Sequence, residues 1–145
     1  MLGREKSLLI GHDGEKYSPE GIEEALVEHS RYVDQVMLHN NQSPSTVALV
    51  VPNQDAVLAY LSHHGLTAGS AEAKAAVARL LEKEIDAYRA GGKHAGTFPE
   101  RWLPARVGVL DEPFTEQNGL VNSTMKIVRG RIEARYKDRL AALHA

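Results

Sequence analysis

The stretch VDQVMLHNNQSPSTVALVVP, residues 33–52, decides the fold. Its two ends, residues 33–39 and 46–52, are rich in valine and leucine, which favour extended structure. The middle, NNQSPS, consists of residues that are typical of turns. The pattern therefore predicts two strands joined by a turn.

On the N-terminal side, SLLIGHDGEKYS predicts a short β-hairpin. Two extended pieces flank His12-Asp13-Gly14, and Asp-Gly is a strong hairpin signal. The next segment, SPEGIEEALVEHS, predicts a helix in which Ser18 is the cap and Pro19 is the first helical residue.

On the C-terminal side, NQDAVLAYLSHHG predicts a short helix capped by Asn53, and Ser70 begins a longer one that Gly91-Gly92 end. The longer helix places one set of apolar residues on a single face: Ala73, Val77, Leu80, Leu81, Ile85 and Tyr88. Residues 105–113 predict a short strand, 114–124 an exposed loop, and 129–143 a single helix. A few strands with segregated helices indicate an α+β fold, in one domain that spans residues 1–145.

The composition of the chain weighs against several classes of function. The net charge of −2 argues against a bulk electrostatic hold on nucleic acid. The chain has no cysteine, which excludes thiolate chemistry and fits a reducing cytosol, so we expect a cytoplasmic protein. No apolar run approaches the roughly 18 residues of a membrane span, and no signal peptide is seen.

The segment 126–139 is basic within this acidic chain. It has six lysines and arginines against two acidic residues, or +4. Such an excess could face a polyanion, but an amphipathic helix with a solvated basic face also explains it, and periodicity alone favours that second interpretation. The seven histidines show no metal-ligand spacing, so we predict no metal site.

Three stretches in order carry a family resemblance. GREKSLLIGHDGEKYSPEGIEEAL resembles the start of the C-terminal domain of the adenylate-forming enzymes, the acyl-CoA synthetase and ligase superfamily. QVMLHNNQSPSTVALVVPN is similar to the next strand pair of that domain. FTEQNGLVNSTMKIVRGRIEARYKDRL resembles the terminal motif of the long-chain branch, Phe-Thr-x-x-Asn-Gly-x-Leu-Thr-x-Thr-x-Lys-x-x-Arg. The resemblance covers nearly the whole chain.

The resemblance implies a small cap domain, with a short hairpin and a small sheet packed with helices, that belongs to a two-step ligase. A carboxylate attacks the α-phosphate of Mg-ATP to give acyl-adenylate and pyrophosphate, and the thiol of CoA then displaces AMP. We expect the chain to be the mobile C-terminal domain of a larger fatty acid–CoA ligase and to be inactive alone. Its partner would be the N-terminal adenylation domain, which holds most of the ATP and fatty acid sites. Peripheral membrane attachment of that whole enzyme is left open.

The resemblance also implies roles for single residues. Lys126 matches the lysine that bridges the attacking carboxylate and the phosphate, and Arg4 matches an arginine beside the nucleotide. Lys6 matches the hinge of the domain rotation. Gly14, with Glu15, matches the hairpin that the pantetheine arm of CoA passes in the second step.

The terminal motif departs from the family in two places. Met125 stands where glycine is frequent, and Asn122 or Ser123 stands where proline is usual. Two alternative functions remain: a polyanion- or nucleic-acid-binding module that uses the basic C-terminal helix, and a cap-domain homologue that has lost catalysis.

Overall fold

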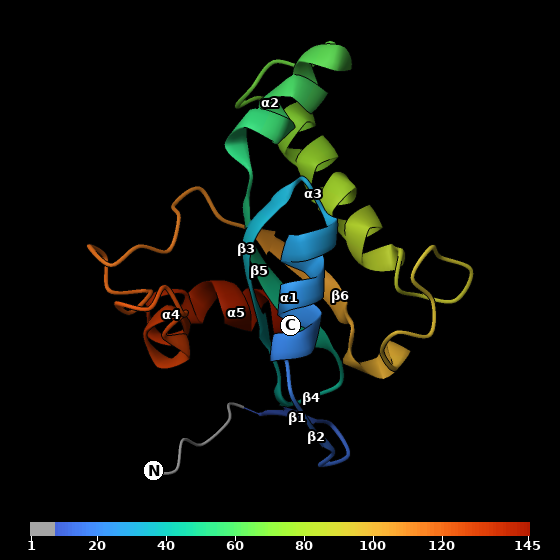
Figure 1. The fold of residues 1–145 in the computed structure, drawn as a ribbon, viewed down its shortest axis with the longest axis vertical. Coiled ribbons are helices and arrows are strands. Elements are labelled where there is room, and N and C mark those ends of the chain that lie inside the picture. The colour runs from blue at the N-terminus through green and yellow to red at the C-terminus, as the bar shows by residue number, and fades with distance from the viewer. Residues whose placement is uncertain (1–7) are drawn as a thin grey trace.

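The structure is a computed structural model that describes residues 8–145. It confirms the predicted α+β class, with two small sheets and helices on both faces of the larger one (Figure 1). The elements in chain order are β1 (Leu9–Gly11), β2 (Lys16–Tyr17), α1 (Glu20–His29), β3 (Val33–His39), β4 (Asn41–Ser43), β5 (Thr46–Pro52), α2 (Gln54–His63), α3 (Ala71–Asp86), the 3-10 turn η1 (Glu100–Trp102), β6 (Pro104–Val109), α4 (Arg129–Arg135) and α5 (Lys137–His144).

The central sheet has the strand order β3-β5-β6. β3 and β5 are the two strands that residues 33–52 predict, and they pair antiparallel. β6 pairs parallel with β5, and the connection between them contains α2 and α3. Every residue of β5 is buried, because helices cover both faces of the sheet.

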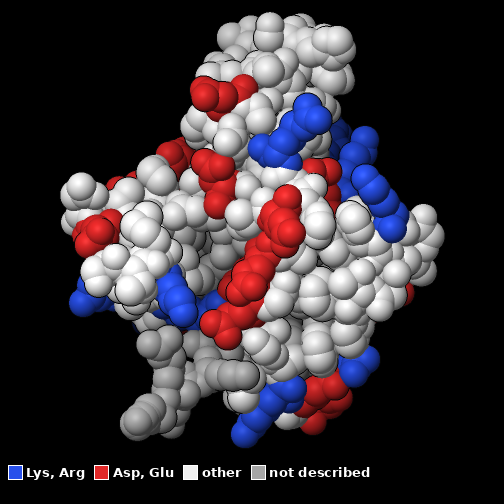
Figure 2. Space-filling model, in the orientation of Figure 1, with Lys and Arg blue, Asp and Glu red and all other residues white. Residues whose placement is uncertain are grey.

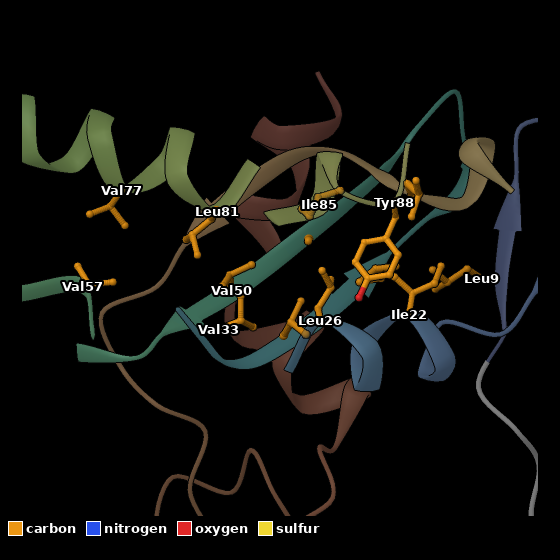
Figure 3. Close-up of a cluster of buried hydrophobic side chains, with 14 of the residues drawn as sticks. Leu9, Ile22, Leu26, Val33, Val50, Val57, Val77, Leu81, Ile85 and Tyr88 are labelled. Carbon is orange, nitrogen blue, oxygen red and sulfur yellow. The ribbon is translucent and has the colours of Figure 1, made fainter. Parts of the chain in front are cut away.

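Alternation along the strands divides the core in two. One face of the sheet, with Val36 and Val50, packs against α1 and α3, whose buried side chains converge on it in Figure 3. The other face, with Met37 and Leu49, packs against Ile132 and the rest of the C-terminal segment. The domain therefore has three layers, and the segment that resembles the terminal motif contributes to the second core rather than lying outside the fold.

Two of the predicted helix caps are confirmed and one is wrong. The side-chain oxygens of Asn53 and Ser70 accept hydrogen bonds from backbone N–H groups at 2.9 and 3.1 Å at the starts of α2 and α3. α1 instead begins after Pro19, without a side-chain cap, so the prediction for Ser18 fails.

The ends of two helices also differ from the prediction. α3 ends at Asp86, ahead of the Gly91-Gly92 pair, and a series of turns follows it. The predicted helix 129–143 is broken at Tyr136, where φ is −111° and ψ is 28°. The break changes the direction of the chain, so that α5 packs on β5 and β6.

The predicted hairpin is present, and it belongs to a second sheet of order β2-β1-β4. β4 lies inside the NNQSPS segment that predicts only a turn, and it pairs parallel with β1. This short strand fixes the hairpin to the end of the β3–β5 pair (Figure 1). Within residues 8–145, no helix has both the length and the apolar character needed to cross a membrane.

Candidate functional site

Lys126 lies at the exposed tip of a narrow loop. Val121 and Ile127 form an antiparallel bridge at its foot, and the Asn122 N–H donates to the Lys126 carbonyl at 2.9 Å. Residues 122–126 are all exposed. Val121 is buried, so the loop leaves the core directly and returns to it after five residues.

The Asn122 side chain organises this tip. Its Oδ1 atom accepts hydrogen bonds from the Thr124 N–H at 2.9 Å, the Thr124 hydroxyl at 2.7 Å and the Lys126 N–H at 3.1 Å. Between Thr124 and Lys126, Met125 has a φ of 64°, in the left-handed region that glycine adopts without cost. The resemblance places a glycine at the Met125 position in many members of the family, and this backbone geometry is one that glycine favours.

The segment that precedes the tip is buried at several points, so the prediction of an exposed loop over 114–124 is wrong there. Phe114 and Leu120 belong to the second core and are 2% exposed. Asn118 holds the turn between them, since its Oδ1 accepts from the Thr115 and Leu120 N–H groups at 2.9 and 3.1 Å. Large apolar residues at the ends of this segment, rather than its polar middle, determine its position.

Gln35 on β3 fixes the same turn to the central sheet. Its side-chain amide donates to the Phe114 carbonyl at 2.9 Å and accepts from the Phe114 N–H at 2.8 Å. Sequence reasoning missed this contact because 79 residues separate the two partners. The foot of the Lys126 loop is thereby tied to the sheet.

The basic residues near Lys126 differ in whether their side chains contact other groups of this chain. Four arginines donate to groups of this chain: Arg129 to Glu23, Arg131 to the Gly119 carbonyl, Arg135 to Glu112 and Arg139 to the Val109 carbonyl. Lys126 has no ion pair with any residue of the range 8–145. On the face in Figure 2, lysines and arginines lie in separate groups among acidic side chains. This arrangement weighs against a polyanion-binding helix, because most of its guanidinium groups already have partners.

Arg129 is the clearest correction to the solvated-helix interpretation. Both of its terminal nitrogens donate to the Glu23 carboxylate, which also accepts from the Leu38 N–H at 2.7 Å. The side chains of Arg129 and Glu23 are 13% and 9% exposed. Burial raises the pKa of Glu23, while the guanidinium and the Leu38 N–H act in the opposite direction. The pair joins α4 to α1 and β3, only three residues after Lys126.

The β1–β2 hairpin presents Gly14 to solvent. Gly14 has a φ of 88°, and a Cβ atom added to it would meet no atom within 4 Å. The hairpin borders a cavity of about 230 Å³ that Tyr17, Asn40 and Arg101 help to line. The left-handed backbone explains why glycine is needed here, and the open surroundings leave space beside it.

Glu15 has a structural contact that sequence reasoning missed. Its two carboxylate oxygens accept from Arg101 Nε and Nη2, each at 2.7 Å, and one of them accepts from Trp102 Nε1 at 3.2 Å. The Trp102 ring stacks on Tyr17 with centroids 5.1 Å apart. Hydrogen bonds from Arg101 and then Trp102 lower the pKa of Glu15 to about 2. Glu15 thus ties the hairpin to η1.

The low pKa of Glu15 predicts how stability depends on pH. A carboxyl whose folded-state pKa is depressed stabilises the fold above its unfolded value, near 4.5, and that stabilisation is lost as the pH falls from 4.5 toward 2. We expect the urea midpoint of Glu15→Gln to fall less steeply than that of the unmodified chain between pH 4.5 and 3. Glu24→Gln, on the exposed face of α1, is the matched control and should keep the original slope. Equal slopes for both variants would contradict the prediction.

Two of the expected site residues, Arg4 and Lys6, lie outside the described residues. Among residues 8–145 no group of three or more histidine, aspartate or glutamate side chains is arranged to hold a metal ion. One histidine pair is close, with His39 Nδ1 2.9 Å from His144 Nε2. Burial lowers the pKa of both imidazoles, which is typical of a neutral packing contact between β3 and the end of α5.

Comparison with known proteins finds relatives that match over the whole length of this chain. No family model matches the chain. Long chain acyl-CoA synthetase 8 of Arabidopsis thaliana is 31% identical over 146 residues, which cover 100% of this chain and 20% of that protein. The chloroplastic long-chain-fatty-acid–[acyl-carrier-protein] ligase AEE15 of the same plant is 26% identical over 100% of this chain and 18% of its own length. The chain spans about a fifth of these relatives.

A solved structure shares the fold. The adenylation domain of a carboxylate reductase from Mycobacterium chelonae superposes with a TM-score of 0.75 at 24% identity, over 94% of this chain and 19% of that one. The fold is therefore that of a domain found in adenylate-forming enzymes. Its relatives over the whole chain are long-chain acyl-CoA synthetases and ligases.

Proposed function

We propose that the chain is the C-terminal domain of an ATP-dependent long-chain fatty acid–CoA ligase and that Lys126 is its adenylation residue. The observation that carries the proposal is the Lys126 ammonium, which lies on a fixed, exposed tip without an ion-pair partner in the described chain. Neighbouring arginines are held by internal contacts. A lysine presented in this way is suited to an anion that another domain holds.

In the first half-reaction, a carboxylate oxygen of the fatty acid attacks the α-phosphorus of ATP. The bond from that phosphorus to the bridging oxygen breaks, and pyrophosphate leaves. Negative charge builds on the phosphoryl oxygens at the transition state, and an ammonium placed there stabilises it while orienting the carboxylate. The chain offers Lys126 for this role. We assign Mg²⁺ to the nucleotide and the adenylation domain; among residues 8–145, no group of three or more histidine, aspartate or glutamate side chains is arranged to hold a metal ion.

In the second half-reaction, the CoA thiol attacks the acyl carbon, AMP leaves with the electron pair, and the thiol proton is released. We place the β1–β2 hairpin with Gly14 at this step. The hairpin and the Lys126 loop, which precedes α4, occupy separate parts of the surface (Figure 1). Because one cleft cannot receive both at once, a rotation of the domain about Lys6 would exchange them between the two steps.

The final acceptor has a second candidate. A relative that matches the whole chain is named as a ligase of long-chain fatty acids to acyl-carrier-protein. The first half-reaction is the same for both acceptors, so the role of Lys126 does not depend on the choice. The second step distinguishes them, since it requires either CoA or the carrier protein's thiol.

The test is a chimera in which residues 1–145 replace the aligned fifth of Arabidopsis long chain acyl-CoA synthetase 8. We expect palmitate-dependent exchange of pyrophosphate into ATP, and acyl transfer to CoA, from the chimera and neither from the chain alone. Acyl-CoA formation by the chain alone would contradict the proposal. A chimera that unfolds cooperatively and still transfers a preformed acyl-adenylate to CoA, yet shows no exchange, would contradict the adenylation role. Supplying acyl-carrier-protein in place of CoA identifies the acceptor.

A further inference from the structure

We propose that Asn122 is the positioning residue of the adenylation step, because its side chain sets the conformation in which Lys126 is presented. The inference rests on the proposed function for the role of Lys126. Its structural part, that Asn122 alone organises the loop tip, stands on the described contacts of residues 121–127.

Within residues 8–145, every hydrogen bond of the tip residues 122–126 involves Asn122. Its Oδ1 atom accepts from the Thr124 N–H, the Thr124 hydroxyl and the Lys126 N–H. Its backbone N–H donates to the Lys126 carbonyl, and its carbonyl accepts from the Met125 N–H, each at 2.9 Å. One residue thus holds the backbone of the three residues that follow Ser123.

This set of contacts supports a conformation that the backbone would otherwise avoid. Met125 is not glycine, yet its φ is 64°, where the Cβ atom of an ordinary residue is crowded by its own backbone. Met125 is 66% exposed, so little packing holds it in place. The hydrogen bonds of Asn122 on either side of Met125 offset this strain. Without them we expect the tip to relax and the direction of the Lys126 side chain to become variable.

The contacts contribute little to the fold itself. All five residues of the tip are exposed, and the core begins at Val121 on one side of the loop. Strain that is held in an exposed tip, with a dedicated side chain to maintain it, indicates a functional conformation rather than a packing requirement. The side chain that this tip positions is that of Lys126, which the proposed function places at the phosphate during adenylation.

Three variants of the chain test the structural part. Asn122→Ala removes the acceptor oxygen, Asn122→Asp keeps one, and Ser123→Ala is the matched control, since the Ser123 hydroxyl takes no part in these bonds. We expect the Thr124 and Lys126 amides of Asn122→Ala to exchange with solvent at least about tenfold faster, with ¹⁵N order parameters below about 0.6. Asn122→Asp and Ser123→Ala should keep the original values, and all three should keep the urea midpoint. Unchanged amide exchange in Asn122→Ala would overturn the proposal whatever the function of the protein.

The same substitutions in the chimera test the positioning role. For Asn122→Ala we expect kcat of adenylation to fall about 10- to 100-fold, the scale expected for a misplaced catalytic group, with KM for ATP and fatty acid within about twofold. Transfer from preformed acyl-adenylate to CoA should be unchanged, and Asn122→Asp should restore most of the adenylation rate. A loosened tip with an unchanged adenylation rate would overturn the positioning role alone. Loss of the proposed function itself would be seen separately, as full adenylation by the Lys126→Ala chimera.

Discussion

Replacing Lys126 by alanine in the chimera is expected to lower the rate of adenylate formation by about 10²- to 10³-fold, the usual effect of removing one charge-stabilising donor from a transition state. Thioester formation from preformed acyl-adenylate should be nearly unchanged, because the ammonium acts only while the phosphoryl group carries extra charge. Pyrophosphate exchange measures the first step, and release of AMP from the added adenylate measures the second.

Two further variants sharpen this result. Lys137→Ala removes another exposed lysine, at the start of α5, and should leave both half-reactions at their original rates. Lys126→Arg keeps the charge but replaces a compact ammonium by a planar, bulkier guanidinium, so we expect it to restore only a small part of the activity. An equal loss of both half-reactions in Lys126→Ala would contradict the assigned role, since it would indicate damage to the domain rather than to one chemical step.

Replacing Arg129 by methionine is expected to destabilise the domain by about 3–5 kcal/mol, the range for breaking a buried ion pair by removal of one partner. The Glu23 carboxylate would remain buried with the Leu38 N–H as its remaining contact of those described. Urea unfolding at pH 7 measures the change. Lowering the pH should reduce the cost, because the burial that raises the pKa of Glu23 favours the protonated, uncharged carboxyl.

The double variant Glu23→Met/Arg129→Met separates loss of the pair from exposure of a lone charge. Since it leaves no unpaired charge, we expect it to recover most of the lost stability. Arg135→Met is the matched control. Its ion pair with Glu112 is exposed, with side chains 44% and 45% accessible, and its loss should hardly shift the midpoint. An Arg129 variant as stable as the Arg135 variant would contradict the structural role of the buried pair.

Local signals in the sequence predicted much of the fold. Asn53 and Ser70 cap their helices because a cap depends on residues only three positions apart. The strands of residues 33–52 follow from their own composition. The parallel pairing of β4 with β1 was missed, because that segment carries turn residues and gains its partner only in the folded chain. The break at Tyr136 was missed because the apolar spacing continues through it.

The candidate site was likewise only partly predictable from the sequence. The resemblance located Lys126, but the shape of its loop depends on side-chain contacts that no periodicity reveals. The Arg129–Glu23 pair spans 106 residues, and the Gln35–Phe114 contact spans 79. Asn122 did leave a signal. Asparagine favours hydrogen bonds to the backbone two residues further on, and this preference alone would have predicted a turn at the tip.

The Arg129–Glu23 pair and the Gln35 contact have a mechanical consequence. They join the foot of the Lys126 loop to α1 and to the central sheet, while Glu15 and Arg101 join the hairpin to η1. In the proposed enzyme, Lys126 would therefore move with the rest of the domain as one rigid body that rotates about the hinge. A small change of angle at the hinge becomes a displacement at the tip with little bending in between, so the hinge angle, together with the tip conformation that Asn122 holds, would set where the ammonium arrives.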